Sequence, residues 1–589
     1  MTNMTADNNN NKKNRFVPFL MAVCVVVGIV VGTFYAQHFS GNKLGIINTS
    51  SNKLNALLRI IDDQYVDTVK MTDLVEEAMP LILSELDPHS SYIPAKDLQA
   101  VNAELKGSFS GVGIQFTIQD DTIHVNSVVE GGPSEKVGLL AGDRIVEIDD
   151  SLFVGKIVNN NEAMRRLKGE KGTQVKLGIY RPGEKELLYF TVIRGDIPTR
   201  SIDTAYLIDG KFGYVNVTKF GETTYTELLI ALAQLNQADC EGLIVDLRGN
   251  TGGYMAAAIQ MVNEFLPNHR LIVYTEGRKE PRRDYHSNGT GSNQKLPLVV
   301  LVDESSASAS EIFAGAIQDN DRGTIVGRRS FGKGLVQQPI EFSDGSAIRL
   351  TIARYYTPSG RCIQKPYDKG NDENYEMDLI TRYEHGEFFS ADSIKQNTTD
   401  LYYTGLGRPV YGGGGIMPDI FVPQDTTGMT SYFRMAATRG LIVRYTFEYT
   451  DHHRSELQAF KTSEELVKYL KKQNLLNLFA TYAERKGLKR RNNLLYQSKT
   501  LFEQSLYGNI VYNMLGKEAY LQYLNLTDKT VQKALEVLRS GTSFPKAPEK
   551  EPQKPATDER SEKTIACVDT TAEKAVSDAP TYSVVFELA

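Results

Sequence analysis

The sequence predicts a multidomain α/β protein in which a mainly-β domain precedes an α/β core, with helical regions at both ends of the chain. Two observations lead to this prediction. The chain has 589 residues, which is more than a single hydrophobic core accommodates. The spacing of its apolar residues also changes several times, from helical to alternating and back to helical.

These changes of spacing define the expected domains. Residues 41–100 carry apolar residues at helical spacing, and residues 101–196 form short alternating strands punctuated by glycine. Residues 197–429 alternate strand-like and helix-like runs, which is typical of an α/β core with parallel strands. Residues 430–540 return to helical spacing. Residues 541–589 are rich in Pro, Lys, Glu, Ala and Thr and are expected to be disordered.

Regular elements can be assigned within the core from its apolar runs. The expected strands are residues 211–218, 241–247, 297–302, 323–326, 335–342 and 347–356. The expected helices are residues 223–236, 255–265 and 309–318. Residues 366–408 are polar and irregular, and we expect them to form a long surface loop.

An apolar run near the N-terminus predicts a membrane anchor. Residues 16–37 contain no charged side chain and are numerous enough to cross a bilayer. Lys12, Lys13 and Arg15 precede the run, so the positive-inside rule places residues 1–15 in the cytoplasm. A cleaved signal peptide is the alternative, but the run is long for one. We therefore expect a single-pass protein of the inner (cytoplasmic) membrane whose catalytic part is periplasmic.

The mainly-β segment has the features of a peptide-binding domain. A glycine-bracketed loop, formed by Gly111, Val112, Gly113 and Ile114, leads into a predicted strand. Such a loop presents backbone N–H groups to a terminal carboxylate, while the strand edge pairs with the peptide. Downstream, the run GLLAGDRI resembles a recurrent phrase in the PDZ domains of bacterial proteases. This resemblance implies that residues 111–114 bind the C-terminal tail of a protein or peptide.

Three motifs in the core place polar groups at the ends of predicted elements. Residues 246–253, DLRGNTGG, follow a buried strand with exposed N–H groups that suit an oxyanion. Residues 305–313, SSASASEIF, put serines at a strand-to-helix turn, where the helix N-terminus favours negative charge, although such serines are more often N-caps. Residues 330–338, SFGKGLVQQ, hold one lysine between two glycines, where a solvated charge is the commoner role.

Together these motifs resemble, in order along the chain, the C-terminal processing (tail-specific) peptidase family. The resemblance starts at LDPHSSY (residues 86–92) and includes YYTPSGRCIQ (residues 355–364) and GGGIMPD (residues 413–419). It covers about residues 50–425. It implies a crotonase-like α/β peptidase core with an inserted PDZ domain, and a serine endopeptidase that cuts proteins near their C-termini.

The resemblance also implies roles for individual residues. In that family the nucleophilic serine stands 25 positions before a lysine that acts as its base, which selects Ser308 and Lys333. Gln337, four positions after the lysine, is implied to orient it. For lysine to be a base, its pKa must fall from about 10.4 to about 7, which requires some 4–5 kcal/mol. Burial near Phe331 and Leu335 could supply much of this, and a glutamine adds no charge that would oppose it.

The oxyanion site and the partners complete the expectations. The family implies oxyanion donors from the N–H groups of Ala309 and of Gly252 or Gly253, and the sequence does not distinguish the two glycines. No HExxH motif is present, so neither a metal nor a cofactor is expected. A net charge of −6 argues against a nucleic-acid partner.

The expected partners are protein or peptide substrates with apolar C-termini, and an adaptor or a homo-oligomer is left open. The competing interpretation is a catalytically inactive PDZ scaffold that binds C-terminal tails. The last residues of the chain, 583–589, are themselves apolar, and we expect them to dock in the peptide groove or to be removed by self-processing.

Overall fold

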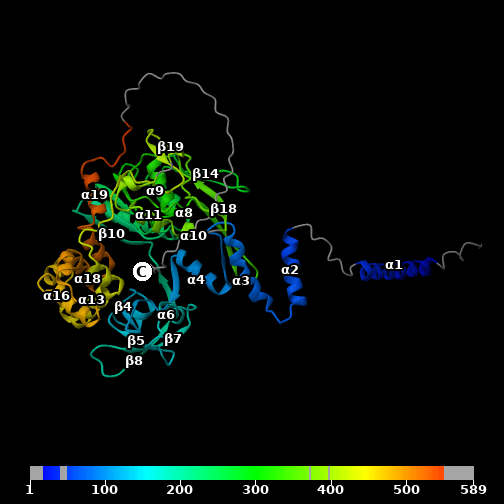
Figure 1. The fold of residues 1–589 in the computed structure, drawn as a ribbon, viewed down its shortest axis with the longest axis horizontal. Coiled ribbons are helices and arrows are strands. Elements are labelled where there is room, and N and C mark those ends of the chain that lie inside the picture. The colour runs from blue at the N-terminus through cyan, green and yellow to red at the C-terminus, as the bar shows by residue number, and fades with distance from the viewer. Residues whose placement is uncertain (1–16, 40–49, 371–372, 396–397, 549–589) are drawn as a thin grey trace, which may run out of the picture. The chain divides into compact units, whose positions relative to one another are not determined.

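The computed structural model describes residues 17–39, 50–370, 373–395 and 398–548 (Figure 1). The chain forms two units, residues 1–546 and residues 547–589. The predicted cytoplasmic segment 1–15 lies outside the described residues. The predicted disordered tail lies outside them from residue 549 onward, as does the proposed docking or trimming of residues 583–589.

The membrane anchor predicted over residues 16–37 is wrong. Among the described residues, no helix combines the length and the apolar character needed to span a bilayer. This holds for the first helix, α1 (Val17–Phe39), as for the others. This finding overturns the predicted single-pass location in the inner membrane and the periplasmic placement that depended on it.

The N-terminal segment contributes helices and one strand to the structure. The helices are α2 (Ser50–Gln64), α3 (Met71–Ser84) and α4 (Ala95–Leu105). Between α3 and α4, β1 (Ser91–Ile93) pairs antiparallel with the long strand β18 (Ala347–Tyr356). The loop before β1 is therefore held against the core.

The mainly-β domain follows α4. Its main sheet has the order β3-β4-β5-β7-β8, with β6 paired to β5, and a separate pair joins β2 to β9. The strands are β2 (Ser108–Gly111), β3 (Ile114–Gln119), β4 (Thr122–Val128), β5 (Arg144–Ile148), β6 (Ser151–Leu152), β7 (Gln174–Tyr180), β8 (Leu188–Ile193) and β9 (Gly195–Pro198), and the helices are α5 (Pro133–Lys136) and α6 (Asn160–Leu167). Helix α6 begins where Asn159 caps it by accepting a hydrogen bond from Glu162 N. One apolar cluster fills the interior of this domain.

A six-stranded sheet forms the centre of the core, in the order β10-β11-β12-β15-β16-β21. Its strands are β10 (Ile202–Ile208), β11 (Phe212–Val217), β12 (Gly242–Asp246), β15 (Leu298–Val302), β16 (Thr324–Gly327) and β21 (Ile420–Phe421). All neighbours are parallel except β10 and β11. Every residue of β12 and β15 is buried, as expected for parallel strands covered on both faces.

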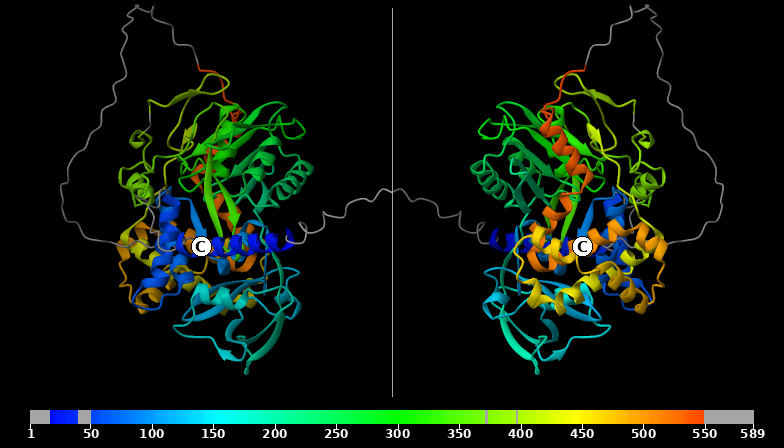
Figure 2. Two further views of the ribbon diagram at one scale, coloured as in Figure 1. Left: turned by 90° about the vertical axis from the view of Figure 1, so that its right-hand side faces the viewer. Right: turned by 90° about the vertical axis from the view of Figure 1, so that its left-hand side faces the viewer.

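Helices cover both faces of this sheet. On one face lie α7 (Thr224–Gln237), α8 (Met255–Asn263) and α9 (Ala309–Asp319), whose apolar side chains share a cluster with those of the strands. On the other face, α19 (Lys529–Arg539) packs against β15 and β16 (Figure 2). Helix α19, the last helix among the described residues, is therefore part of the core of the sheet domain.

A second sheet carries the remaining strands of the core. Its order is β1-β18-β13-β14, and β17 (Leu335–Glu341) pairs with β18 as a hairpin. The other strands are β13 (Leu271–Glu276) and β14 (Arg283–His286). The predicted strands and helices of the core are thus confirmed, and so is the multidomain α/β class with a mainly-β insertion.

The polar segment 366–408 is more regular than predicted. It contains α10 (Glu373–Glu376), α11 (Asp378–Glu384), the 3-10 turn η1 (Ala391–Ser393) and β19 (Leu401–Tyr403), which pairs with β20 (Pro409–Tyr411). Its anchor is the buried Arg382, which donates to Glu387 and to the carbonyl oxygens of Arg329 and Ser330. Because this anchor is polar, apolar periodicity could not reveal it.

The C-terminal helices form their own apolar cluster. They are α12 (Ser431–Thr438), α13 (Leu441–His452), α14 (Arg454–Leu457), α15 (Ser463–Leu470), α16 (Leu475–Arg485), α17 (Asn492–Gln497) and α18 (Lys499–Asn525). Helix α18 is kinked at Gly516, which has a φ of 81°. A salt bridge of 3.1 Å from Arg144 to Asp451 connects these helices with the mainly-β domain.

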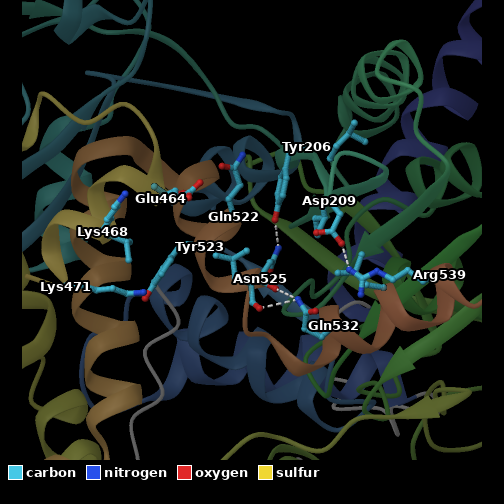
Figure 3. A pocket seen from close by; sticks show the side chains of 16 residues that line it. Tyr206, Asp209, Glu464, Lys468, Lys471, Gln522, Tyr523, Asn525, Gln532 and Arg539 are labelled. Atoms are coloured by element: carbon cyan, nitrogen blue, oxygen red, sulfur yellow. Dashed lines mark hydrogen bonds and ion pairs between the residues drawn. The ribbon is translucent and has the colours of Figure 1, made fainter.

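A cavity of about 860 Å³ lies between β10, α15, α18 and α19 (Figure 3). Several of its polar side chains bond to one another or to backbone. Asn525 donates to the Tyr206 hydroxyl over 2.8 Å, Gln532 donates to the carbonyl oxygen of Asn525, and Arg539 pairs with Asp209. These contacts attach the C-terminal helices to the edge strand of the core sheet.

Candidate active site

Ser308 occupies the turn between β15 and α9, immediately before the first residue of the helix. Its φ of 56° and ψ of −113° are unusual for a residue with a Cβ, and such a conformation costs about 1–3 kcal/mol. The surrounding loop is well tied. Ala307 N and the Ser310 hydroxyl both donate to the carbonyl oxygen of Asn250, over 3.0 and 2.8 Å. The turn therefore fixes the serine at the N-terminus of α9, where developing negative charge is favoured.

Lys333 lies half-buried in the loop that leads into β17. The pKa of Lys333 is lowered from 10.5 to about 8, mainly by burial and to a smaller extent by the nearby positive charge of Arg349. The negative charges of Glu311 and Asp87 act in the opposite direction. A lysine with such a pKa is neutral in part of the population near pH 7 and can then accept a proton.

Gln337 contacts the lysine amine. Its carbonyl oxygen Oε1 lies 3.2 Å from Lys333 Nζ, and its amide nitrogen donates to the backbone carbonyl of His89. The sequence predicted the first contact through the family resemblance and gave no sign of the second. Among the described residues, no hydrogen bond joins the Ser308 hydroxyl directly to Lys333 Nζ.

Glu311 connects the serine loop with the lysine loop. Its side chain is fully buried and accepts four hydrogen bonds, from Ser308 N, the Ser330 hydroxyl, Gly332 N and Lys333 N, at 2.5–2.8 Å. Sequence reasoning missed this role. The available signal was the Ser-x-x-Glu spacing from residue 308 to 311, which is that of a capping box.

Tyr355 makes a second connection between the two loops. Its buried hydroxyl bridges the carbonyl oxygens of Ser308 and Lys333, the first at 3.0 Å. The tyrosine lies on β18, and its neighbour in the hairpin is β17, which begins next to Lys333. Tyr355 is the first residue of the YYTPSGRCIQ motif, but nothing in the local sequence indicates that its hydroxyl reaches these two loops.

The two candidate oxyanion glycines differ in their hydrogen bonding. Gly252 N donates to Asn250 Oδ1 over 2.9 Å, whereas Gly253 N has no hydrogen-bond partner in the described part of the chain. Gly252 has a φ of 105°, and a Cβ on it would lie 2.7 Å from Ser308 Cβ and 2.9 Å from Ala309 N. Only glycine therefore allows this strand end to approach the serine turn so closely.

The residues predicted to hold a peptide tail form a loop at the entrance to β3. The carbonyl oxygen of Val112 accepts from Ser134 N and from the Ser134 hydroxyl, over 3.0 and 2.7 Å. Gly113 has a φ of 79°, and a Cβ there would lie 2.9 Å from Ile197 Cδ1. Gly111 forms a bridge with Lys168, next to the end of α6. The loop is thus rigidly placed between β2, β3 and α6.

Replacing Glu311 by glutamine is expected to lower turnover by about tenfold to a hundredfold. The glutamine nitrogen cannot accept two of the four hydrogen bonds, so the loops that carry Ser308 and Lys333 shift relative to each other. Initial rates of protein cleavage measure this effect. The matched control is Glu264→Gln, since Glu264 is also buried and accepts from Ser292 N and Asn293 Nδ2 away from the site. Equal rates for both variants would contradict the role of Glu311.

The same variant should change how stability depends on pH. Burial raises the pKa of Glu311 from 4.5 to about 7, against the opposing effect of its hydrogen bonds. The stabilising contribution of its proton is therefore complete below about pH 4.5 and disappears as the pH rises through 7. Because glutamine does not titrate, the free energy of unfolding of Glu311→Gln relative to wild type should improve by about 2–3 kcal/mol from pH 5 to pH 8. Urea unfolding at both pH values measures this difference.

Comparisons with known proteins identify relatives of the chain. Residues 211–376 match the model of peptidase family S41, residues 110–192 match the PDZ domain, and residues 432–516 match a family of unknown function (DUF8443). A carboxy-terminal-processing protease of Bartonella bacilliformis is 38% identical over 352 residues, which are 58% of this chain and 80% of that protein. The carboxy-terminal processing protease CtpA of Bacillus subtilis is 33% identical over 59% of this chain and 74% of its own.

A solved structure is also similar to the chain. The photosystem II D1 C-terminal processing protease is 25% identical, and the match covers 64% of this chain and 95% of that one, with a TM-score of 0.34.

Proposed function

We propose that Ser308 and Lys333 carry out catalysis and that the PDZ domain holds the substrate tail, because this chain belongs to peptidase family S41 and is a carboxy-terminal processing serine protease. The observation that carries this proposal is the pair of loops joined by Glu311. One loop presents a serine in a strained turn, and the other presents a lysine with a pKa of about 8.

The reaction proceeds by acyl transfer. In its neutral form, Lys333 Nζ accepts the Ser308 hydroxyl proton as Oγ attacks the scissile carbonyl carbon. The tetrahedral intermediate then collapses, the C–N bond breaks, and Lys333 returns the proton to the leaving amine. A water molecule, deprotonated by the same lysine, then attacks the acyl carbon. The ester bond to Ser308 Oγ breaks, Lys333 returns the proton to Oγ, and the new C-terminus is released. The contact between Oγ and Nζ is expected to form when substrate is bound, since catalytic hydrogen bonds often tighten at that stage.

The oxyanion that forms in each step needs fixed donors. We assign this role to the N–H groups of Ala309 and Gly253. The N–H group of Ala309 lies at the start of α9, and that of Gly253 has no other partner among the described residues. Gly252 is the less suitable donor because its N–H is already bonded to Asn250. Its contribution is to let the strand end approach Ser308.

The PDZ domain selects the substrate by its C-terminus. The peptide pairs with the edge of β3, and its terminal carboxylate is bound by the loop of Gly111, Val112, Gly113 and Ile114. Ile114, Phe116 and Ile118 are partly buried apolar side chains of β3, the strand with which the peptide pairs, and they favour tails with apolar side chains. Substrates are therefore proteins with accessible, apolar C-terminal tails.

Replacing the apolar C-terminal tail of an unfolded protein substrate by a charged tail is expected to raise KM about tenfold. This corresponds to a loss of about 1.4 kcal/mol of binding free energy. Quantified cleavage of the two substrates gives kcat and KM separately. Gly113→Ala should raise KM for the apolar tail, because its new Cβ would meet Ile197.

Gly155→Ala is the matched control for this variant, since Gly155 has a similar φ of 83° but no atom within 4 Å of the added Cβ. Cleavage that does not depend on the tail would refute the role of the PDZ domain. Tight binding of tails without any cleavage would instead fit the inactive scaffold.

A further inference from the structure

The loop of residues 87–90 lies against the catalytic lysine although it belongs to the N-terminal segment. It precedes β1, which pairs with β18 in the register Ser91 to Arg349. The family model of the peptidase begins only at residue 211, so this loop is outside the matched peptidase region. Its contacts show how the N-terminal segment completes the site.

Asp87 organises the loop from within. Its carboxylate is buried and accepts hydrogen bonds from His89 N and Ser90 N, both at 2.9 Å, and from the Ser90 hydroxyl at 2.6 Å. It also accepts from the Thr351 hydroxyl at 3.0 Å, while Thr351 N donates to Ser90 Oγ at 3.1 Å. Thr351 lies on β18 directly opposite Gln337 on β17. The loop is therefore attached to the hairpin at the position of Gln337.

The His89 carbonyl determines which end of the Gln337 amide faces the lysine. A carbonyl oxygen can only accept a hydrogen bond, so it must face the Gln337 amide nitrogen. The amide oxygen is then directed at Lys333 Nζ, 3.2 Å away. The His89 ring is held separately, with Nε2 2.7 Å from the Tyr375 hydroxyl.

We propose that the loop of residues 87–90 is a positioning element for the general base, acting through Gln337. With the amide oxygen facing it, neutral Lys333 donates one N–H to Gln337 and keeps its lone pair free for the Ser308 proton. With the amide reversed, the Gln337 nitrogen would donate to that lone pair and block the base. This inference rests on the proposed roles of Ser308 and Lys333, and it adds Asp87 and the His89 carbonyl as the groups that set the direction of the lone pair.

The test compares Asp87→Ala with Asp344→Ala in the full chain. Asp344 makes the same kind of turn, accepting from Ser346 N and the Ser346 hydroxyl, but in the β17–β18 hairpin turn. Asp87→Ala should lower kcat about a hundredfold, the effect expected when a reacting group is displaced by an ångström, with KM changed less than about twofold. Asp344→Ala should keep the wild-type kcat. Rates are expressed per active serine, titrated with a fluorophosphonate, so that misfolded protein does not contribute.

Two further variants keep the test decisive if Asp87→Ala folds poorly. Asp87→Asn retains an oxygen that accepts from both backbone N–H groups and from Thr351, so it should keep kcat within about tenfold of wild type. Its pH profile should not move to higher pH, because removing the carboxylate removes a charge that raises the pKa of Lys333. Thr351→Val breaks the 3.0 Å bond to Asp87 without a change of charge and should lower kcat by about tenfold.

The proposal is overturned if Asp87→Ala and Thr351→Val show the wild-type kcat per titrated serine, or if their losses equal that of Asp344→Ala. Lys333→Met is measured in the same assay. If that variant stayed active, the Ser308 and Lys333 chemistry itself would be wrong, which is distinguishable from failure of the loop's role.

Discussion

Replacing Ser308 by alanine is expected to lower kcat by about 10⁶-fold, the loss found when a serine nucleophile is removed from a catalytic constellation whose members act as a unit. The hydroxyl is the atom that forms the acyl-enzyme, and the loop around residue 308 is held by backbone bonds that alanine keeps, from Ala307 N to Asn250 O and from Ser308 N to Glu311. The fold and the binding of substrate should therefore persist. Cleavage rates, substrate affinity and labelling by a fluorophosphonate measure the three properties on one preparation.

The matched control for this variant is Ser305→Ala. Ser305 lies in the same serine-rich turn, and its backbone N donates to Asp303. Its hydroxyl makes no hydrogen bond to the described residues, so alanine at this position removes none. It should retain full activity and labelling. If the cleavage rate of Ser308→Ala stayed within tenfold of wild type, the nucleophile would be another group. The hydrogen bonds of residues 307–311 would then serve only to stabilise the fold.

The reactive groups could be predicted from the sequence more readily than the contacts that position them. Ser308, Lys333 and Gln337 lie in short motifs, so a family resemblance assigns them, and the structure places Gln337 Oε1 beside Lys333 Nζ. The partner of the other end of Gln337 is the carbonyl of His89, which stands 248 positions earlier in the chain. A backbone carbonyl has no side-chain identity, and no spacing rule connects two residues so far apart.

The elements of the fold could likewise be predicted from the local sequence, whereas their packing partners could not. Apolar periodicity identified the strands of the core because β12 and β15 are continuous buried runs. It could not show that α19 covers the second face of that sheet, because an amphipathic helix does not indicate which surface it will pack on. The membrane anchor predicted from the N-terminal apolar run is wrong, because no helix among the described residues combines the length and the apolar character that a bilayer requires.

Replacing Lys333 by methionine is expected to lower kcat by about 10⁴-fold, since the proton of Ser308 then has no acceptor. In the wild type, the pKa of about 8 predicts that kcat/KM rises about tenfold per pH unit below pH 8 and becomes constant above it. The active form is the neutral amine, so the loss lies on the acid side. Rates from pH 6 to pH 9.5 with one substrate give the midpoint.

The same substitution should make the protein more stable at neutral pH. The folded pKa of Lys333 lies below the unfolded value of 10.5, so the charged amine is disfavoured in the fold. This cost is complete below pH 8 and disappears as the pH rises through 10.5, and methionine removes it, adding up to about 3 kcal/mol to the free energy of unfolding at pH 7. Lys333→Arg is the matched variant, because arginine stays charged, cannot act as the base and should gain no stability. We expect both variants to be inactive and only the methionine variant to be more stable than wild type, which would separate the loss of the base from the loss of the buried charge. If the arginine variant were as stable as the methionine variant, the charge at this position would not be desolvated.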